Sequence, residues 1–327
     1  MTTAVMTERH VPVLLNEVVQ ALAVRPGGLY VDCTVGGGGH AEAILEASAM
    51  DGQLLGIDAD PEALAAAADR LRGYLGRVTL VEANFRDVAV VCRQRGFVPV
   101  DGILLDLGMS SMQLEEAARG FSFQREGPLD MRFSPQGVLT ASDIVNGYRE
   151  DQLADLLWRF GEERHSRRIA RAIVAARPLY TTTQLARVVE QAVGRGVRGV
   201  THPATRTFQA LRIAVNEELV SLATALSQAH GLLDSGARLA VVSYHSLEDR
   251  IVKDFIRRES SDCLCPPGVP LCVCGHVASL KPTGRGAVKP SPAEVAANPR
   301  ARSARLRVAQ RLPPGPASAR AKGPASD

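Results

Sequence analysis

The stretch that decides the fold is eleven residues long and reads Tyr30-Val31-Asp32-Cys33-Thr34-Val35-Gly36-Gly37-Gly38-Gly39-His40. Its apolar start predicts a short buried strand, which four consecutive glycines break before a helix begins. Glycine has no Cβ atom and tolerates positive φ angles, so a ligand can lie almost against the backbone of such a loop. Asp32 adds a carboxylate beside the loop, where it would repel a pyrophosphate but favour a cationic ligand.

A second acid follows at the distance expected for a nucleoside site. Asp58 lies twenty residues after Gly38 and ends the apolar run 54–57. An acid at the end of the second strand commonly holds a ribose diol. Together, the two acids and the loop favour a nucleoside-type cofactor with little phosphate, and S-adenosylmethionine fits best. Because the loop also satisfies the G-x-G-x-x-A dinucleotide fingerprint, an NAD-dependent dehydrogenase remains the alternative.

Strands and helices alternate through the first third of the chain and again near its end. This alternation predicts a parallel sheet covered by helices on both faces, an α/β fold. We expect strands over residues 29–34, 53–58, 78–81, 102–108 and 239–244, with helices over 14–22, 40–48, 61–74, 88–95 and 205–230. Ligands bind at the carboxyl ends of such strands. The glycine loop, Asp58, Phe85 and Asp106 all fall at these ends.

The region between the fourth and fifth strands follows a different pattern. Residues 113–205 show amphipathic helices, at 150–160, 164–176 and 182–193, and no convincing strand. We therefore expect an all-helical domain at 113–205, inserted into an α/β domain made of residues 1–112 and 206–312. Within the second part, residues 304–309 alternate like an edge strand. Residues 313–327 are rich in Pro, Ala, Gly and Ser and are expected to be a disordered tail.

The composition is that of a globular protein, with 46% apolar residues and only 4% aromatic residues in 327. The chain has no apolar run near the roughly 20 residues of a membrane helix and no secretory signal pattern, so we expect a cytoplasmic protein without membrane contact. The net charge is +3 overall, but the segment from Lys281 onward carries ten basic and two acidic residues. This segment favours a polyanionic partner or is a solvated basic tail.

Two residues at strand ends are candidates for chemistry. Asp106 ends the fourth strand, where a methyltransferase brings the donor and the accepting atom together, and it is the best catalytic candidate. Its alternative role is to cap the following turn. Phe85 follows the third strand, where its ring can cover one face of an adenine or fill the core.

Basic side chains mark a candidate surface for nucleic acid. Arg164, Arg167, Arg168 and Arg171 follow the spacing i, i+3, i+4, i+7, which places them on one face of a predicted helix. Such a stripe can follow a phosphate backbone or be a solvated helix face. Arg206 ends a polar loop at 201–206 that can contact substrate or cap the next helix.

Four cysteines cluster in a Pro-rich loop as Cys263-x-Cys265 and Cys272-x-Cys274, with His276 nearby. Clustered thiols suggest zinc, but the C-x-C spacing is tighter than the usual two to four intervening residues. The sequence therefore favours thiols that bind no metal.

With these residues identified, the chain closely resembles the RsmH/MraW family of bacterial 16S rRNA cytosine-N4 methyltransferases over roughly residues 9 to 312. The resemblance rests on motifs that occur in one order along the chain: His10–Leu15, Gly36–His40, Asp101–Gly108, Arg119–Phe123, Gly127–Arg132, Gly161–Arg164, His202–Ala210, Ser246–Arg250 and Asn298–Ser303.

The resemblance implies a Rossmann-like class I methyltransferase fold with an inserted all-helical domain for substrate recognition. It implies methyl transfer from S-adenosylmethionine to the exocyclic N4 amine of a cytidine in the decoding region of the small ribosomal subunit. The family's donor-binding positions fall on Gly38, Gly39, His40, Asp58, Phe85, Asp106 and Gln113, of which Gln113 is assigned through the resemblance alone. No catalytic residue carries over, and a homodimer remains open.

Overall fold

The computed structural model describes residues 12–194, 202–267 and 271–314, which fall into two compact units. The first unit is drawn from Met1–Asp58, Leu64–Gly108 and Leu222–Asp327, and the second from Ala59–Ala63 and Met109–Ser221. Of the tail predicted to be disordered, residues 315–327 lie outside the described residues. None of the helices in the described ranges is long and apolar enough to cross a membrane.

The first unit is built on a seven-stranded sheet with the order β3-β2-β1-β4-β5-β7-β6. Its strands are β1 (Leu29–Asp32), β2 (Gln53–Asp58), β3 (Val78–Glu82), β4 (Val100–Asp106), β5 (Leu233–Ser243), β6 (Leu280–Pro282) and β7 (Arg305–Arg311). The pairs among β1 to β5 are parallel, whereas β7 is antiparallel to both β5 and β6. The predicted Rossmann-like α/β fold is confirmed.

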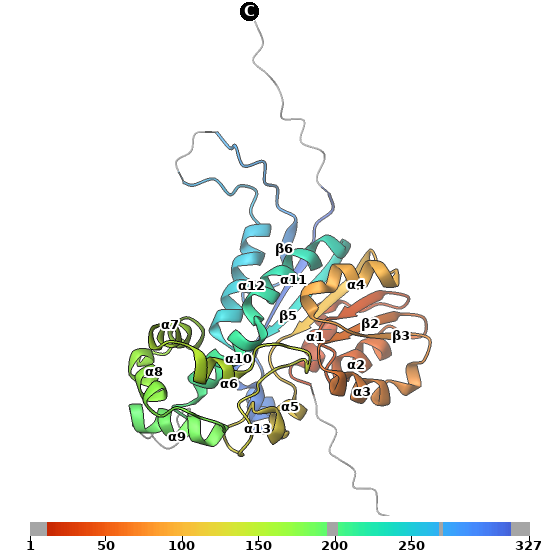
Figure 1. Cartoon of the computed structure of the whole chain (residues 1–327). Helices are drawn as coiled ribbons and strands as arrows, with labels where there is room; N and C mark the ends of the chain where they lie inside the picture. The colour runs from red at the N-terminus through yellow and green to blue at the C-terminus, as the bar shows by residue number, and fades with distance from the viewer. Residues whose placement is uncertain (1–11, 195–201, 268–270, 315–327) are drawn as a thin grey trace, which may run out of the picture. The chain divides into compact units, whose positions relative to one another are not determined.

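Helices cover both faces of this sheet (Figure 1). Alternate strand residues enter two cores: Tyr30 and Leu54 enter one, and Val31 and Leu55 enter the other. The first core contains residues of α1 (Leu15–Leu22), α2 (Gly39–Ala47) and the later part of α3 (Pro61–Arg70). The second contains residues of α4 (Val88–Arg95), α11 (Glu218–Leu232) and α12 (Ser246–Glu259). Short segments complete the unit: η1 (Arg72–Tyr74), η2 (Phe85–Asp87), α13 (Pro292–Ala297) and η4 (Pro299–Ser303).

Two sequence expectations were wrong in this part of the fold. The segment at 304–309 is not an edge strand, because β6 pairs with the outer side of β7. At three residues, β6 is too short for its periodicity to be visible in the sequence. The long helix expected over 205–230 is two helices, because Glu217 adopts a left-handed φ of 50° between them.

The second unit is helical in its described part. Its elements are α5 (Ser111–Glu115), η3 (Ala117–Arg119), α6 (Ala141–Gly147), α7 (Glu150–Gly161), α8 (Ser166–Ala175), α9 (Thr182–Val193) and α10 (Thr205–Asn216). Capping boxes at Thr140 and Thr181 begin α6 and α9, each by bonding the backbone N–H three residues later. The core includes Leu153, Ile169 and Leu211, from α7, α8 and α10. Thus α10 packs within this unit, although its sequence position suggested the α/β domain.

Candidate active site

The glycine loop is fixed to the ends of the first two strands. The Val35 N–H donates to the Ile57 carbonyl at 2.9 Å, and the Gly36 N–H donates to Oδ2 of Asp58 at 2.9 Å. These two bonds hold the loop after β1 against the carboxyl end of β2. Asp58 is thus placed at a strand tip beside the loop, as the sequence predicted.

The four glycines of the loop differ in the space that surrounds them. A Cβ atom on Gly37 would meet nothing within 4 Å, and one on Gly36 would come no closer than 3.8 Å to another residue's atom. On Gly38, where φ is +79°, it would lie 3.3 Å from Cα of Ala67, and on Gly39 it would lie 2.2 Å from Cγ of Pro12. Gly38 and Gly39 therefore permit close packing, whereas Gly36 and Gly37 form an open shelf that the sequence analysis did not single out.

Three carboxylates meet at the tips of neighbouring strands β1, β2 and β4. Asp32 is only 1% exposed, and burial, assisted by the negative charges of Asp106 and Asp58, raises its pKa to about 7 despite opposing contributions from His40 and Thr34. Its Oδ1 accepts the Thr34 N–H at 3.1 Å, but its buried Oδ2 has no hydrogen-bond partner among the described residues. A cation bound here would compensate this charge, which the protein itself leaves poorly satisfied.

Asp106 is held on more than one side. Its Oδ1 accepts the Tyr244 hydroxyl at 2.8 Å, and its backbone N–H donates to Oγ1 of Thr34 at 2.7 Å. Burial raises the pKa of Asp106 to about 7, with Glu248 adding to the rise and the Tyr244 hydrogen bond opposing it. A carboxyl group with this pKa can accept a proton at neutral pH.

His40 supports Asp106 from inside the fold. The ring is 5% exposed, and its Nε2 lies 3.0 Å from the Val13 carbonyl, which places the proton on Nε2. Burial foremost lowers the pKa of His40. The bare Nδ1 then faces Oδ2 of Asp106 at 3.5 Å, an arrangement that favours a proton on the carboxyl group and agrees with its raised pKa. His40 thus positions Asp106 at the base of the site.

Phe85 and Gln113 have different surroundings. Phe85 begins η2, after β3, and packs partly buried against the core of the first unit. Gln113 belongs to the second unit, where its Oε1 accepts the Ser110 N–H at 3.0 Å and its Nε2 donates to Oδ2 of Asp60 at 2.8 Å. The donor-binding roles of Phe85 and Gln113 stay predictions.

Tyr244 adjoins the candidate site through Asp106, and the sequence analysis did not single it out. Its hydroxyl is the hydrogen-bond donor to Asp106, and its backbone N–H donates to Oε2 of Glu248 at 2.9 Å. Burial raises the pKa of the phenol well above its usual range, so it stays a neutral donor. The rule that ligands bind at the carboxyl ends of parallel strands would have identified Tyr244. This residue directly follows β5, which pairs with β4.

A cationic cavity adjoins Tyr244 at the same end of the sheet. It has a volume of about 390 Å³ and is lined by Tyr244, His245, Ser246, Lys289, Arg302, Ser303, Ala304 and Arg305. Arg305 also pairs with Asp249 at 3.0 Å. The basic and hydroxyl side chains suit an anionic group next to the Asp106–Tyr244 pair.

The predicted arginine stripe lies on the second unit. Helix α8 begins at Ser166, two residues later than expected, so Arg164 precedes the helix. Arg167, Arg168 and Arg171 are exposed opposite the buried Ile169 and Ile173. Arg206 is also exposed, and its guanidinium donates to the Glu162 carbonyl at 3.2 Å.

The family described as the MraW methylase family matches residues 7–312. The chain belongs to the MraW methylase family. A relative named ribosomal RNA small subunit methyltransferase H from Dehalococcoides mccartyi is 58% identical over 93% of this chain and 86% of its own length. A relative of the same name from Thermomicrobium roseum is 54% identical over 94% of this chain and 95% of its own length. An rRNA methylase structure from Streptococcus thermophilus aligns over 91% of this chain and 94% of its own, with a TM-score of 0.41 and 10% identity.

Membership of the MraW methylase family decides between the two cofactors considered above. Its members depend on S-adenosylmethionine, which is therefore the cofactor of this chain. The NAD-dependent dehydrogenase alternative is wrong. The physical reason lies in the strand tips: three carboxylates surround the glycine loop, where a dinucleotide would place its anionic pyrophosphate.

Proposed function

We propose that this chain transfers a methyl group from S-adenosylmethionine to the N4 amine of a cytidine in the decoding region of 16S rRNA. The curated relatives support a substrate in small-subunit ribosomal RNA, because their name states it and this chain spans nearly all of their length. One structural observation carries the chemistry: Asp32, Asp58 and Asp106 meet beside an open glycine shelf, and no lysine or arginine of the described residues pairs with Asp32 or Asp106.

The residues at the strand tips fit a cationic nucleoside donor. Gly36 and Gly37 leave room for the ligand against the backbone, and Asp58 stands at the position of a ribose-binding acid. Asp32 offers a buried oxygen that lacks a partner among the described residues. When bound, S-adenosylmethionine supplies an activated methyl group on a positively charged sulfur. A positive charge there would lower the pKa of Asp32 and Asp106 and hold both as carboxylates.

Asp106 has the properties that the acceptor requires. The lone pair of the cytosine amine is delocalised into the ring, so the amine is a poor nucleophile. A carboxylate that accepts a hydrogen bond from this amine draws the nitrogen out of the ring plane and takes its proton after attack. The Tyr244 hydroxyl and the Thr34 hydroxyl keep Asp106 in one orientation, which aligns the acceptor with the methyl group.

The RNA must present its base out of the stack, so its backbone needs separate points of attachment. The cavity with Lys289, Arg302 and Arg305 adjoins Tyr244 and suits a phosphate near the target nucleotide. The exposed arginines of α8 provide a second phosphate-binding surface, on the unit formed mostly by the insertion. We therefore assign donor binding and one phosphate contact to the α/β domain, and further substrate recognition to the helical domain.

The test is methyl transfer to ribosomal RNA that lacks the modification. Small subunits from a strain without this methylase are incubated with the chain and isotopically labelled donor, and nuclease fragments are mapped by mass spectrometry. We expect one labelled methyl group on the base of a cytidine in a decoding-region fragment. A label on another base, on a ribose or in another fragment would overturn the N4-cytidine assignment.

A further inference from the structure

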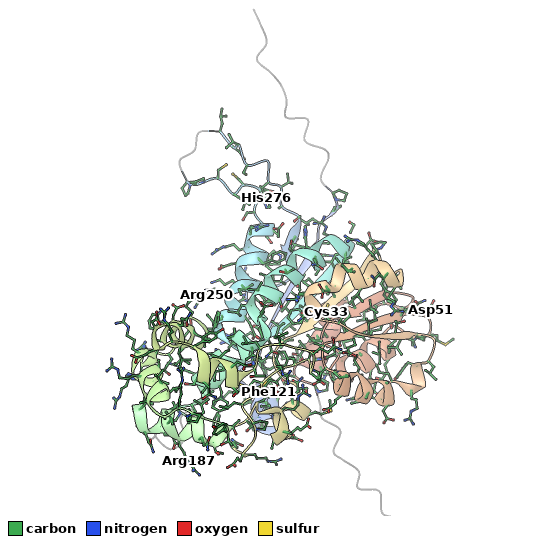
Figure 2. The ribbon with its side chains drawn as sticks, in the orientation of Figure 1. Cys33, Asp51, Phe121, Arg187, Arg250 and His276 are labelled. Atoms are coloured by element: carbon green, nitrogen blue, oxygen red, sulfur yellow. The ribbon has the colours of Figure 1, made fainter. Side chains whose placement is uncertain are left out.

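The segment between α12 and β6 brings four thiols together away from the proposed active site. Cys263, Cys265, Cys272 and Cys274 each place Sγ within 4.8 Å of the other three. All four lie in the first unit, in the loop that projects from α12 and β6 in Figure 1. His276, which Figure 2 labels in this loop, is not a fifth member of the cluster, because its Nε2 lies 3.0 Å from the Arg258 carbonyl.

The distances between the sulfur atoms have the values of a single tetrahedral site. Sγ of Cys272 lies 3.4 Å from Cys263, 4.0 Å from Cys265 and 3.5 Å from Cys274. Sγ of Cys274 lies 3.9 Å from Cys263. Four thiolates at the Zn–S distance of about 2.3 Å around one ion are separated by about 3.8 Å, the edge of that tetrahedron. We infer that these four cysteines bind one zinc ion.

Other uses of the thiols fit the geometry less well. A disulfide requires sulfur atoms about 2.05 Å apart, and each cysteine here has more than one sulfur neighbour at a similar, longer distance. An iron–sulfur cluster spreads its cysteines over several metal ions, so their sulfur atoms lie farther apart than around one ion. Four sulfur ligands around one closed centre are typical of structural zinc.

Backbone N–H groups are already directed at the sulfur atoms. The Cys265 N–H donates to Sγ of Cys263 at 3.4 Å, and the Leu264 N–H donates to Sγ of Cys274 at 3.3 Å. The His276 N–H also donates to the sulfur of Cys274. In both Cys-x-Cys segments, therefore, one cysteine sulfur accepts the N–H of the residue two positions later. Such bonds stabilise thiolates, and zinc binding would release the thiol protons to solvent.

A zinc ion would stabilise this loop, whose described residues have few apolar contacts. Leu271, Val273 and Val277 are 78%, 84% and 56% exposed, and no described residue of 260–279 belongs to a hydrophobic core cluster. The loop is tied at its base, where the Ser279 N–H donates to the Glu259 carbonyl at 2.8 Å. Zinc would link the Cys263-x-Cys265 segment to the Cys272-x-Cys274 segment and so restrict the conformation of the loop beyond its base.

The experiment measures metal content in the full chain, purified under reducing conditions without a metal-affinity step. Elemental mass spectrometry should find about one zinc per chain, and Cys265→Ser and Cys272→Ser should each reduce this to background. The matched control is Leu264→Ala, which alters the residue between two ligands and should keep the zinc. Cobalt(II) exchanged into the site should show the intense visible bands of a tetrahedral thiolate complex.

The cysteine variants should fold, because their side chains lie outside the cores, and calorimetry with S-adenosylmethionine should show unchanged donor affinity. Zinc content and methyl transfer are read separately, so failure of the proposed function leaves the metal result intact. Thermolysin should cleave the loop faster after zinc is removed by a chelator. The inference would be overturned by any of four results. These are background zinc after incubation with one equivalent of the metal, iron in place of zinc, two disulfides in the reduced preparation, or equal zinc loss in Leu264→Ala.

Discussion

The strand tips of the first unit and the outer face of α8 in the second hold charged residues in opposite ways. Asp32 is buried and Asp106 partly buried at the strand ends, and both carry raised pKa values and are fixed by hydrogen bonds. Arg167 and Arg168 are exposed on a helix whose other face is packed. Ionising the carboxyl groups at the first site costs desolvation free energy, and each has its own contacts. Each exposed arginine at the second site contributes little free energy, so several must act together. Substitutions should therefore have large effects at the strand tips and small ones on α8.

The largest effect is expected for Asp106→Asn. The amide keeps the size of the side chain but cannot accept the amine proton, so the rate of methyl transfer should fall by about 10²–10⁴-fold. Single-turnover transfer to unmodified small subunits measures this rate, and calorimetry with S-adenosylmethionine checks that the donor site is intact. At donor concentrations well below saturation, where Asp106 titrates in the donor-free chain, the rate in the unchanged protein should rise with pH through about 7 as Asp106 loses its proton.

Asp101→Asn is the matched control for this substitution, because Asp101 lies near the start of the same strand and pairs with Arg25. Its rate of transfer should stay near that of the unchanged chain. An Asp106→Asn variant that turns over normally, or a pH profile that is flat through neutrality at subsaturating donor, would remove Asp106 from the chemistry.

The next largest effect concerns the pH dependence of stability. Asp32 has a pKa of about 7 in the folded chain, against about 3.9 for an unfolded aspartate. The folded state then binds more protons between these values, so the free energy of unfolding should decrease as the pH rises from about 4 to about 7. Asp32→Asn should recover about 1–3 kcal/mol at pH 8 without donor, less than the full linkage because water and relaxation screen the charge.

Thermal unfolding across this pH range measures the effect. Asp51→Asn, which changes an exposed acid of the same unit, should leave the pH profile as it is. S-Adenosylmethionine should stabilise the unchanged chain more than Asp32→Asn, because the substitution removes a carboxylate that favours the cation. If Asp32→Asn destabilises the donor-free chain at pH 8, Asp32 does not carry an uncompensated charge.

A third prediction separates the glycines of the loop. A methyl group on Gly37 meets open space, so Gly37→Ala should fold normally and weaken donor binding about tenfold, or ~1.4 kcal/mol, by occupying the shelf. Gly38→Ala should instead lower the melting temperature, because its φ of +79° and its contact with Ala67 both oppose a side chain. Calorimetry and thermal unfolding of both variants test this, and equal donor affinity in Gly37→Ala and the unchanged chain would contradict an open shelf.

The sequence allowed much of the fold to be predicted, for local reasons. Glycines, N-caps and apolar runs act over a few residues, so β1 to β4 and the helices between them follow from the pattern. The break at Glu217 did not, because a single left-handed residue leaves no apolar signature. The strand β6 did not either, since its pairing with β7 depends on tertiary contacts and not on its three residues.

The candidate site was predictable where it depends on strand ends. Asp58 and Asp106 were identified because parallel strands end at one edge of a sheet, and the same rule applied to Tyr244 would have found it. The contact of His40 with Asp106 required the packed structure, as did the convergence of Cys263 and Cys272. Spacing along the chain does not reveal distances between thiols that a loop brings together.

The smallest effect is expected for Arg167→Ala combined with Arg168→Ala, and it tests the other half of the comparison. If these arginines neutralise two phosphates, the dependence of log affinity on log salt should become shallower by about 1.4 for single-stranded RNA, with a several-fold loss of affinity at low salt. The fold should be unaffected, because both side chains are exposed while Ile169 and Ile173 form the packed face.

Arg159→Ala is the control, since Arg159 is exposed on α7 but already paired with Asp155 at 3.2 Å. Filter binding of an rRNA fragment over a range of salt concentrations gives the slopes. An unchanged slope in the double variant would make the stripe an ordinary solvated helix face and leave the cavity beside Tyr244 as the principal contact with the RNA backbone.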